Sequence, residues 1–428
     1  MQRIAFISEH ASPLAPLGGI DSGGQNVYVG NLARELGRLG YLVDVYTRRD
    51  DPVAPQVVDW RPGVRVIAMD AGPARVLPKE ALLPYMPQFA QEMQHFLQQQ
   101  ALRYALAHAN FFLSGMVAQQ LKQRLGLPYV ITFHALGRVR RLCQGAADGF
   151  PDARFALEEA LMRDADCVIA ECEQDRRDML SLYGGAPARL SVVPCGFDPD
   201  EFWPVRATAR ATLGLPERDF IVLQLGRMVP RKGIDNVLHA LRLLLDDHRI
   251  AARLLVVGGE GGDDPMATPE IRRLAQLART LGIDDQVSFA GAQPRHRLRE
   301  YYSAADVFVT TPWYEPFGIT PLEAMACATP VIGSAVGGIL STVLDRQTGF
   351  LVPPNDPPAL AAQLARLQRD PALAQRMGWT GLRRAQRHFT WDRVAMQMAS
   401  VYRAVLASNE AGGAAAAAAS PAVSGMAQ

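Results

Sequence analysis

The chain has 428 residues, of which 49% are apolar and 20% are charged, and this ordinary globular composition suffices for two domains of roughly 200 residues each. Its 44 Lys and Arg residues balance 43 Asp and Glu residues, so the charge gives no reason to expect nucleic acid or an anionic membrane as the main partner. No apolar run approaches the roughly 18 residues of a membrane-spanning helix, and the N-terminus lacks a signal-peptide pattern.

The first half of the chain alternates short apolar strands with amphipathic helices. One helix is predicted from Gln25, with apolar side chains at helical spacing and Gly40 at its end, and another spans Asp175–Tyr183. The predicted strands are Arg3–Ser8, Leu42–Thr47, Val64–Met69, Tyr129–Phe133, Cys167–Ala170 and Ser191–Val193.

The second half repeats this alternation. Its predicted strands are Phe220–Leu225, Arg253–Val257, Val287–Ala290, Asp306–Thr310 and Pro330–Ser334. Helices are predicted at Asn236–Leu245, Glu270–Leu281, Leu298–Ala304 and Pro321–Ala328. The alternation predicts parallel sheets with right-handed crossovers, and therefore an α/β protein of two doubly wound domains.

Two segments have a different composition. Pro194–Pro204 is rich in Pro, Gly and Asp and has no periodicity, so we expect it to join the domains and to act as a hinge. After a last predicted helix at Trp391–Leu406, residues 408–428 are mostly Ala, Gly, Ser and Pro. That stretch has almost nothing to bury and is predicted to be a disordered tail.

Two carboxylates, Glu315 and Glu323, stand eight positions apart around a predicted helix start. Gly318 allows close backbone approach, and Ile319 and Thr320 can present N–H groups to an anion. A strand-to-helix turn of this kind is where open α/β sheets bind nucleotides. Residues 320–323 also fit a capping box, and in that alternative the second glutamate needs no ligand.

Two cations, Arg227 and Lys232, follow the predicted strand Phe220–Leu225 directly. Ligands of open sheets bind at this end of a strand, where two cations can hold a diphosphate and neutralise it as a leaving group. The spacing is not that of a Walker P-loop, so ATP hydrolysis is not indicated. Alternatively, Arg227 and Lys232 are ordinary loop residues whose charges are solvated by water.

A glycine-rich loop, residues 18–28, lies between the first predicted strand and the first predicted helix. It is not a G-x-G-x-x-G motif, so a nicotinamide dehydrogenase is not supported. Gly23 and Gly24 would let the loop lie against a substrate and aim a helix N-terminus at a phosphate, although glycines here also permit a simple tight turn.

His134 follows the predicted strand Tyr129–Phe133, at the sheet edge where the glycine-rich loop is expected. A single histidine here fits either a structural or a functional role. Arg138, Arg140 and Arg141 follow it, and this basic cluster suits either an anionic ligand or a solvated loop.

Together these motifs resemble the retaining glycosyltransferases of family 4, over nearly all of residues 1–405. The glycine-rich loop resembles a branch that includes sucrose synthases, sucrose-phosphate synthases and inositol-phosphate N-acetylglucosaminyltransferases. The resemblance implies the GT-B fold, in which two Rossmann-like, doubly wound parallel-sheet domains face each other across a cleft. Residues 1–198 would bind the acceptor and 205–388 the nucleotide sugar, and 389–407 would return as a helix to the first domain.

The resemblance also implies roles for the donor site. Glu323 would bind the nucleotide ribose, and Glu315 would lie against the transferred sugar. Arg227 and Lys232 would grip the two phosphates, and His134 would lie near the reacting centre, so these three and Glu315 are the predicted catalytic set. Further donor contacts are predicted at Gly23, Gly24, Gly318, Ile319 and Thr320. The nucleobase would be read near 291–295, largely through backbone groups.

For the acceptor, the predicted contacts are Asn26, Lys79, Arg138 and Arg154. The inositol-phosphate branch holds its acceptor phosphate with a Lys, a Tyr, a Thr and an Arg. Lys79 and Arg154 match two of them, but Phe111 and Ala135 stand at the Tyr and Thr positions. Losing two hydroxyl donors would weaken such a site by roughly 1–3 kcal/mol per bond, so a phosphorylated acceptor is expected while inositol phosphate is not favoured.

The expected reaction is transfer of a glucosyl or N-acetylglucosaminyl unit from a UDP-sugar to a hydroxyl of a sugar or polyol. Retention through same-face attack, assisted by the leaving phosphate, is what the resemblance implies. Three alternatives stay open. They are a sucrose-phosphate or mannosylfructose-phosphate synthase, a nucleotide-sugar epimerase or phosphorylase, and a non-catalytic sugar-nucleotide-binding module.

The five cysteines match no zinc or disulfide framework, and no metal-ligand cluster is visible. We therefore expect reduced thiols, a cytoplasmic location, and no metal or cofactor besides the donor substrate. Nucleic acid is not an expected partner, while weak peripheral membrane association and the oligomeric state stay open.

Overall fold

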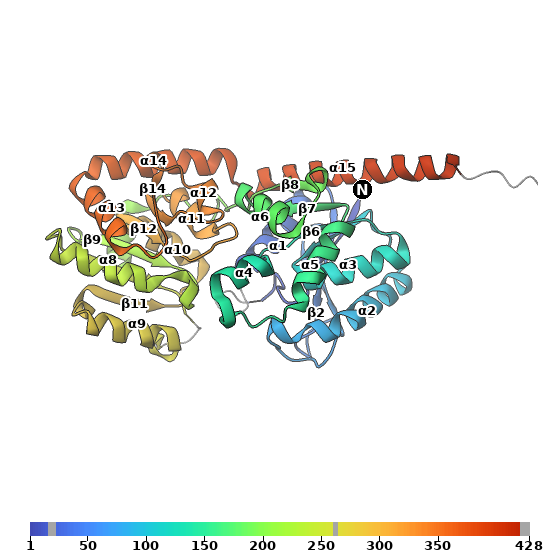
Figure 1. Ribbon diagram of the computed structural model, residues 1–428, viewed down its shortest axis with the longest axis horizontal. Helices are drawn as coiled ribbons and strands as arrows, with labels where there is room; N and C mark the ends of the chain where they lie inside the picture. Colours follow the sequence, from blue (N-terminus) through green and yellow to red (C-terminus); the bar gives the residue numbers. More distant parts are fainter. Residues whose placement is uncertain (16–22, 260–263, 420–428) are drawn as a thin grey trace, which may run out of the picture.

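The computed structural model describes residues 1–15, 23–259 and 264–419, with side chains up to Ala411. Within these ranges the chain forms two lobes side by side, each built on its own sheet (Figure 1). The start of the glycine-rich loop, residues 16–22, lies outside the described residues.

The first lobe contains an eight-stranded sheet of order β3-β4-β2-β1-β5-β6-β7-β8. All neighbours pair in parallel except β3 and β4. The strands are β1 Arg3–Ile7, β2 Leu42–Arg48, β3 Val57–Arg61, β4 Val64–Met69, β5 Leu106–Asn110, β6 Tyr129–Thr132, β7 Cys167–Ala170 and β8 Leu190–Val192. Helices α1 Gly24–Arg38, α2 Met86–Gln99, α3 Phe112–Leu125, α4 Gly137–Gln144, α5 Ala153–Asp164 and α6 Glu173–Tyr183 belong to this lobe.

The second lobe contains a six-stranded, all-parallel sheet of order β11-β10-β9-β12-β13-β14. Its strands are β9 Phe220–Leu225, β10 Ala252–Val257, β11 Val287–Gly291, β12 Val307–Thr310, β13 Val331–Ser334 and β14 Gly349–Val352. The helices are α7 Arg206–Leu213, α8 Ile234–Asp246, α9 Pro269–Thr280, α10 Leu298–Ala304, α11 Ile319–Ala326, α12 Ile339–Thr342, α13 Pro357–Arg369 and α14 Pro371–His388. Both sheets are doubly wound, as the alternation of strands and helices predicts.

Most predicted strands lie within one or two residues of the observed ones, but β3, β5 and β14 were not predicted. The strand β5, Leu106–Asn110, is buried throughout at the centre of the first sheet. Its His108 and Asn110 break the apolar run that predicts a buried strand. Both side chains are hydrogen bonded, which is how a core accommodates polar groups.

Two segments cross between the lobes and pair with each other. The N–H of Phe197, in the predicted hinge, donates to the carbonyl of Phe389 at 2.8 Å, and the N–H of Trp391 donates to the carbonyl of Phe197 at 3.2 Å. Gly196 lies so close to Trp391 that a Cβ there would be 2.9 Å from the indole ring. The predicted hinge therefore lies at the seam of the lobes, backed by the returning chain.

Helix α15, Trp391–Ala419, returns to the first lobe and packs along α1 (Figure 1). The hydroxyl of Tyr402 is hydrogen bonded to Nδ1 of His108 at 2.6 Å. The helix continues to Ala419, into the stretch predicted as a disordered tail. The alanine run 414–419 has high helix propensity and extends a helix that packing already stabilises. Residues 420–428 lie outside the described residues. Across the described ranges, no helix is long and apolar enough to span a membrane.

Candidate active site

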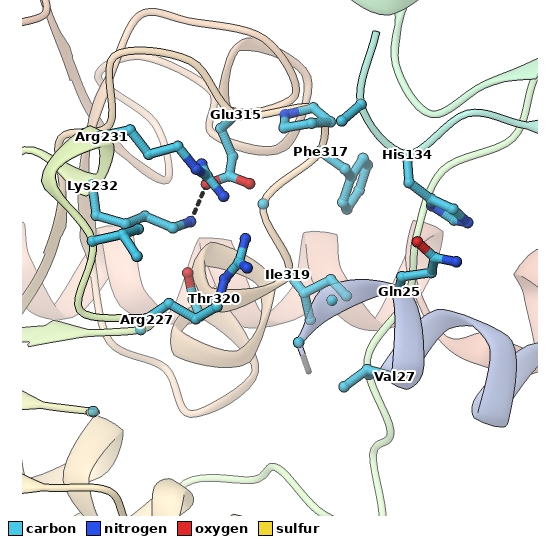
Figure 2. A pocket seen from close by; sticks show the side chains of 18 of the residues that line it. Gln25, Val27, His134, Arg227, Arg231, Lys232, Glu315, Phe317, Ile319 and Thr320 are labelled. Atoms are coloured by element: carbon cyan, nitrogen blue, oxygen red, sulfur yellow. Dashed lines mark hydrogen bonds and ion pairs between the residues drawn. The ribbon is translucent and has the colours of Figure 1, made fainter. Parts of the chain in front are cut away.

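A cleft of about 880 Å³ lies between the two lobes. It is lined by residues that follow β1 and β6 of the first sheet and β9 and β12 of the second. Figure 2 shows Gln25 and His134 on one side of this cleft and Arg227, Lys232 and Glu315 on the other. The carboxyl ends of the strands of both sheets thus meet here, which is where doubly wound folds bind ligands.

The cations of the second lobe lie in the loop that follows β9. Arg227, Arg231 and Lys232 all line the cleft. The ammonium group of Lys232 forms an ion pair with Glu315 (Figure 2). Burial lowers the pKa of Lys232 to about 8, against the opposing effect of Glu315. Burial would raise the pKa of Glu315, but the charges of Lys232 and Arg231 lower it. The pair is therefore ionised at neutral pH, in a partly dehydrated site where charges act strongly.

The loop after β12 leads into α11 with its backbone close to the cleft. Gly318 is the N-cap of α11 with φ of 87°, a conformation that favours glycine. Ile319 and Thr320 begin the helix and line the cleft, so the positive end of the helix faces it. Gly337 lies behind the loop, where a Cβ would be 1.9 Å from the carbonyl oxygen of Glu315. The geometry offers an anion both backbone donors and the cations of the β9 loop.

Glu323 does not form the capping box that its spacing allowed. The helix begins at Ile319 rather than after Thr320, and no side chain caps it. Instead the buried carboxylate of Glu323 accepts hydrogen bonds from Arg295 Nη1 at 3.0 Å and from the Tyr302 hydroxyl at 2.8 Å. Since each carboxylate oxygen can accept two bonds, Glu323 keeps acceptor capacity toward the cleft that it lines.

The glycine-rich loop of the first lobe reaches across to the second. A Cβ on Gly23 would be 3.5 Å from Cδ of Arg227, and a Cβ on Gly24 would be 3.9 Å from Cδ1 of Ile319. Asn26 does not line the cleft. Its side chain accepts from the Gly23 N–H at 2.9 Å and donates to the carbonyl of Ser12 at 2.9 Å, so it holds the loop rather than a substrate.

His134 is held from both sides. Its φ of 58° is uncommon for a non-glycine residue. The ring nitrogens lie 3.1 Å from Oε1 of Glu171 and 3.1 Å from Oδ1 of Asn110, and the Tyr28 ring packs edge-on against it at 4.7 Å. Strain at a residue that is fixed by this many neighbours is a common property of active sites.

Several side chains that line the cleft were not predicted as contacts. His10 lies just after β1, and its Nδ1 is 2.6 Å from Oε1 of buried Glu9, which also accepts from the Ser114 hydroxyl. This arrangement orients the ring toward the cleft, as an acid orients a histidine in many enzymes. Its position after a central strand is the one sequence signal that could have found it. Gln25 and Arg231 also line the cleft; they lie in predicted motifs but were not predicted as contacts. Gln293 and Arg295 line it from the stretch 291–295, where backbone contacts to the nucleobase were predicted.

Of the four residues predicted to contact the acceptor, only Lys79 lines the cleft. Arg140 from the basic cluster lines it too. Arg138 points elsewhere and pairs with Glu159. Arg154 is fully buried, paired with Glu158 at 2.6 Å and enclosed by the rings of Phe111, Phe112 and Phe150. Arg138 and Arg154 therefore do not reach the cleft, because carboxylates next to them on α5 hold their guanidinium groups.

The chain matches two family descriptions, "Glycosyl transferase 4-like domain" over residues 23–196 and "Glycosyl transferases group 1" over residues 205–384. It is 38% identical over 418 residues to a D-inositol 3-phosphate glycosyltransferase of Kineococcus radiotolerans, covering 94% of this chain and 95% of the relative. A D-inositol 3-phosphate glycosyltransferase of Streptomyces bingchenggensis is also 38% identical, with 94% and 89% covered.

Among solved structures, the sucrose-phosphate synthase of Thermosynechococcus elongatus is similar to this chain with a TM-score of 0.87. It is 38% identical, and the similarity covers 95% of this chain and all of that one. Anabaena Alr3699/HepE, solved in complex with UDP and glucose, has a TM-score of 0.72 at 20% identity, with 94% and 100% covered. The second similarity concerns the fold alone.

Proposed function

The chain belongs to the group 1, GT4-like glycosyltransferases with the GT-B fold, and we propose that it moves a hexosyl unit from a UDP-sugar to a phosphorylated sugar or polyol with retention. The observation that carries the proposal is the meeting of two cations, two carboxylates and a helix N-terminus in one cleft. These groups are Arg227, Lys232, Glu315, Glu323 and the start of α11.

The donor half of the proposal follows from charge. As the sugar departs, negative charge builds on the nucleoside diphosphate, and the cations of the β9 loop with the N-terminus of α11 would stabilise it. Three cations at one loop can supply the neutralisation that a divalent metal provides in other phosphoryl sites, so we propose transfer without a bound metal. Glu323 would accept from the ribose hydroxyls, and Glu315 from the hydroxyls of the transferred sugar.

We propose retention on the resemblance to the retaining glycosyltransferases of family 4, and the position of the carboxylates argues against a covalent intermediate. Glu315 is already neutralised by Lys232 and belongs to the donor lobe, so it is not placed as a free nucleophile. Attack of the acceptor oxygen on the anomeric carbon would then occur on the face that the diphosphate leaves. The proton of the acceptor hydroxyl would pass to a phosphate oxygen of the departing diphosphate, so charge and atoms balance.

The acceptor part of the proposal depends on the wall of the cleft that the first lobe provides. Lys79 and Arg140 line this wall and would bind an anionic group while paired with Glu80 at 3.2 Å and with Asp148 at 2.9 Å. His10 and Gln25 supply hydrogen-bonding groups suited to hydroxyls. The names of the two similar proteins each mention a phosphorylated compound: D-inositol 3-phosphate in one and sucrose phosphate in the other. Because Phe111 and Ala135 offer no hydroxyl and Arg154 is enclosed, a hexose phosphate is a better candidate than inositol 3-phosphate.

A two-way screen tests the proposal. UDP-glucose, UDP-N-acetylglucosamine and ADP-glucose are each combined with fructose 6-phosphate, with inositol 3-phosphate or with no acceptor, and released nucleoside diphosphate is measured. We expect release from a UDP-sugar that depends on the phosphorylated acceptor, and an α-configured product by NMR. Turnover of the donor to another free UDP-sugar without acceptor would instead indicate an epimerase, and tight UDP binding without any turnover would indicate a binding module.

A further inference from the structure

Helix α14, Pro371–His388, has an unusual charge composition for a chain whose total charge is nearly balanced. Its 18 residues include Arg376, Arg383, Arg384, Arg387 and His388 and no acidic residue. The helix is the outermost element along one edge of the second lobe (Figure 1). Most of these charges are therefore available to a partner outside the molecule.

The arginines form a stripe on the outward face of α14. Arg376, Arg383 and Arg387 are spaced by seven and four residues, which places them on one line along a helix, and all three are exposed. The buried residues of α14 lie on the opposite side and pack against the second lobe, chiefly α11. They are Met377, Gly378, Gly381, Leu382 and Ala385. The arginine stripe therefore does not serve the packing of the domain.

An indole stands within this stripe. Trp379 lies beside the arginine line and is 46% exposed, although a tryptophan of this size is normally covered. Among the described residues, Arg376, Arg383 and Arg387 form no ion pair with an acidic side chain, and Arg383 donates to the Thr380 hydroxyl at 3.1 Å. We call these four residues, Arg376, Trp379, Arg383 and Arg387, the α14 stripe.

The next helix brings one more arginine to this edge, beside the exposed Asp392. Arg393, near the start of α15, is exposed, and α15 follows α14 end to end along the same edge of the molecule (Figure 1). Partial desolvation, followed by the like charges of Arg384, Arg387 and Arg393, lowers the pKa of His388. Arg384, Arg387 and Arg393 therefore lie close enough to His388 for their charges to act on it.

We propose that the α14 stripe binds the surface of a membrane that contains anionic phospholipids. A straight outer edge fits a flat surface, arginines pair with lipid phosphates, and an indole among them is the side chain that settles at headgroup depth. The apolar face of α14 remains packed on its own domain, so the enzyme would adhere to the surface without inserting a helix. The active-site cleft is not part of this surface.

Vesicle co-sedimentation tests the proposal with the full-length enzyme. We expect binding to vesicles of phosphatidylglycerol and phosphatidylcholine at low salt, little binding to pure phosphatidylcholine vesicles, and release at 0.5 M salt, where the Debye length is only roughly 4 Å. The triple variant R376E/R383E/R387E should bind at least tenfold more weakly. The matched control R103E/R124E/R279E changes three exposed arginines elsewhere by the same total charge and should keep most of the binding.

Tryptophan fluorescence distinguishes binding of vesicles at the α14 stripe from general electrostatic attraction between vesicles and the protein. The chain has five tryptophans, so the spectral shift on adding vesicles is compared between the wild type and the Trp379→Phe variant. We expect the shift to disappear in the variant. UDP binding and circular dichroism show whether the triple variant is folded. Unchanged vesicle binding by the triple variant, equal loss in the matched control, or tighter binding to a 20-base-pair DNA duplex than to anionic vesicles at the same salt would each overturn the proposal.

Discussion

Lys232 and Glu315 form an ion pair that joins the loop after β9 to the loop after β12 and lines the interdomain cleft, with side chains only 13% and 12% exposed. The pair brings together two segments that are far apart in the sequence, and it sets the charge of the site. A diphosphate that enters must share Lys232 with Glu315, so the protonation of this lysine controls how much positive charge the ligand meets.

The first prediction concerns pH. Because burial lowers the pKa of Lys232 to about 8, the free enzyme loses this charge as the pH rises through about 8. UDP binding should be constant below that value and weaken above it, by up to about tenfold per pH unit. Calorimetry between pH 6.5 and 9.5 measures this. In Lys232→Arg the guanidinium stays charged, so its profile should be flat. A flat profile in the wild type would contradict the prediction.

Removal of a cation should weaken donor binding. Arg227→Ala and Lys232→Ala are each expected to lower UDP affinity and transfer at least tenfold, about 1.4 kcal/mol. The loss should be larger for Lys232→Ala, because Glu315 then remains in the cleft without its counter-ion. Arg218→Ala, at an exposed position, is the control. If both variants bind UDP as the wild type does, the diphosphate does not bind at the β9 loop.

Glu323 is expected to act on the ribose. Glu323→Gln keeps the shape but removes the charge that pairs with Arg295, and UDP affinity should fall about tenfold. Affinity for 2′,3′-dideoxy-UDP should change much less, since that ligand lacks the hydroxyls. Tyr302→Phe, which removes one hydrogen bond to Glu323 but no charge, serves as the milder control. Equal losses of affinity for UDP and for 2′,3′-dideoxy-UDP would show that Glu323 does not contact the ribose hydroxyls.

His134 should affect turnover rather than donor affinity. His134→Ala removes a ring that lines the cleft between the glycine-rich loop and the second lobe, and we expect kcat to fall at least tenfold with UDP binding unchanged. His95→Ala on α2, exposed and outside the cleft, should have no effect. Parallel loss of turnover and UDP affinity would show that the histidine belongs to the donor pocket.

Arg154 is expected to stabilise the fold instead of binding the acceptor. Arg154→Met leaves the buried Glu158 without its counter-ion, which should destabilise the protein by about 3–5 kcal/mol. Thermal unfolding measures the loss, and adding Glu158→Gln should recover much of it, because the unpaired charge is then gone. If the variant instead keeps the wild-type Tm but has a raised KM for the acceptor, Arg154 contacts the acceptor and the prediction is wrong.

Local sequence patterns predicted the elements closely where periodicity was unbroken. The apolar run of β9 and the amphipathic spacing of α8 gave both type and position, whereas His108 and Asn110 concealed β5. The fold class and the glycosyltransferase family are confirmed, because motifs at strand ends keep their order and spacing in the chain. The site was predicted in the same way, since residues after central parallel strands must meet at one edge.

What the sequence determined is the set of groups at the strand ends, such as Arg227, Glu315 and His134, because backbone connectivity alone carries them to the cleft. What only the tertiary structure decided is the partner of each charge. Glu323 meets Arg295 and not its own helix cap, and Arg154 meets Glu158 and three phenylalanine rings and not an acceptor. The physical reason is that a long charged side chain pairs with whichever group within its reach gives the lowest free energy. Those groups come from distant parts of the chain, so the local sequence does not identify them.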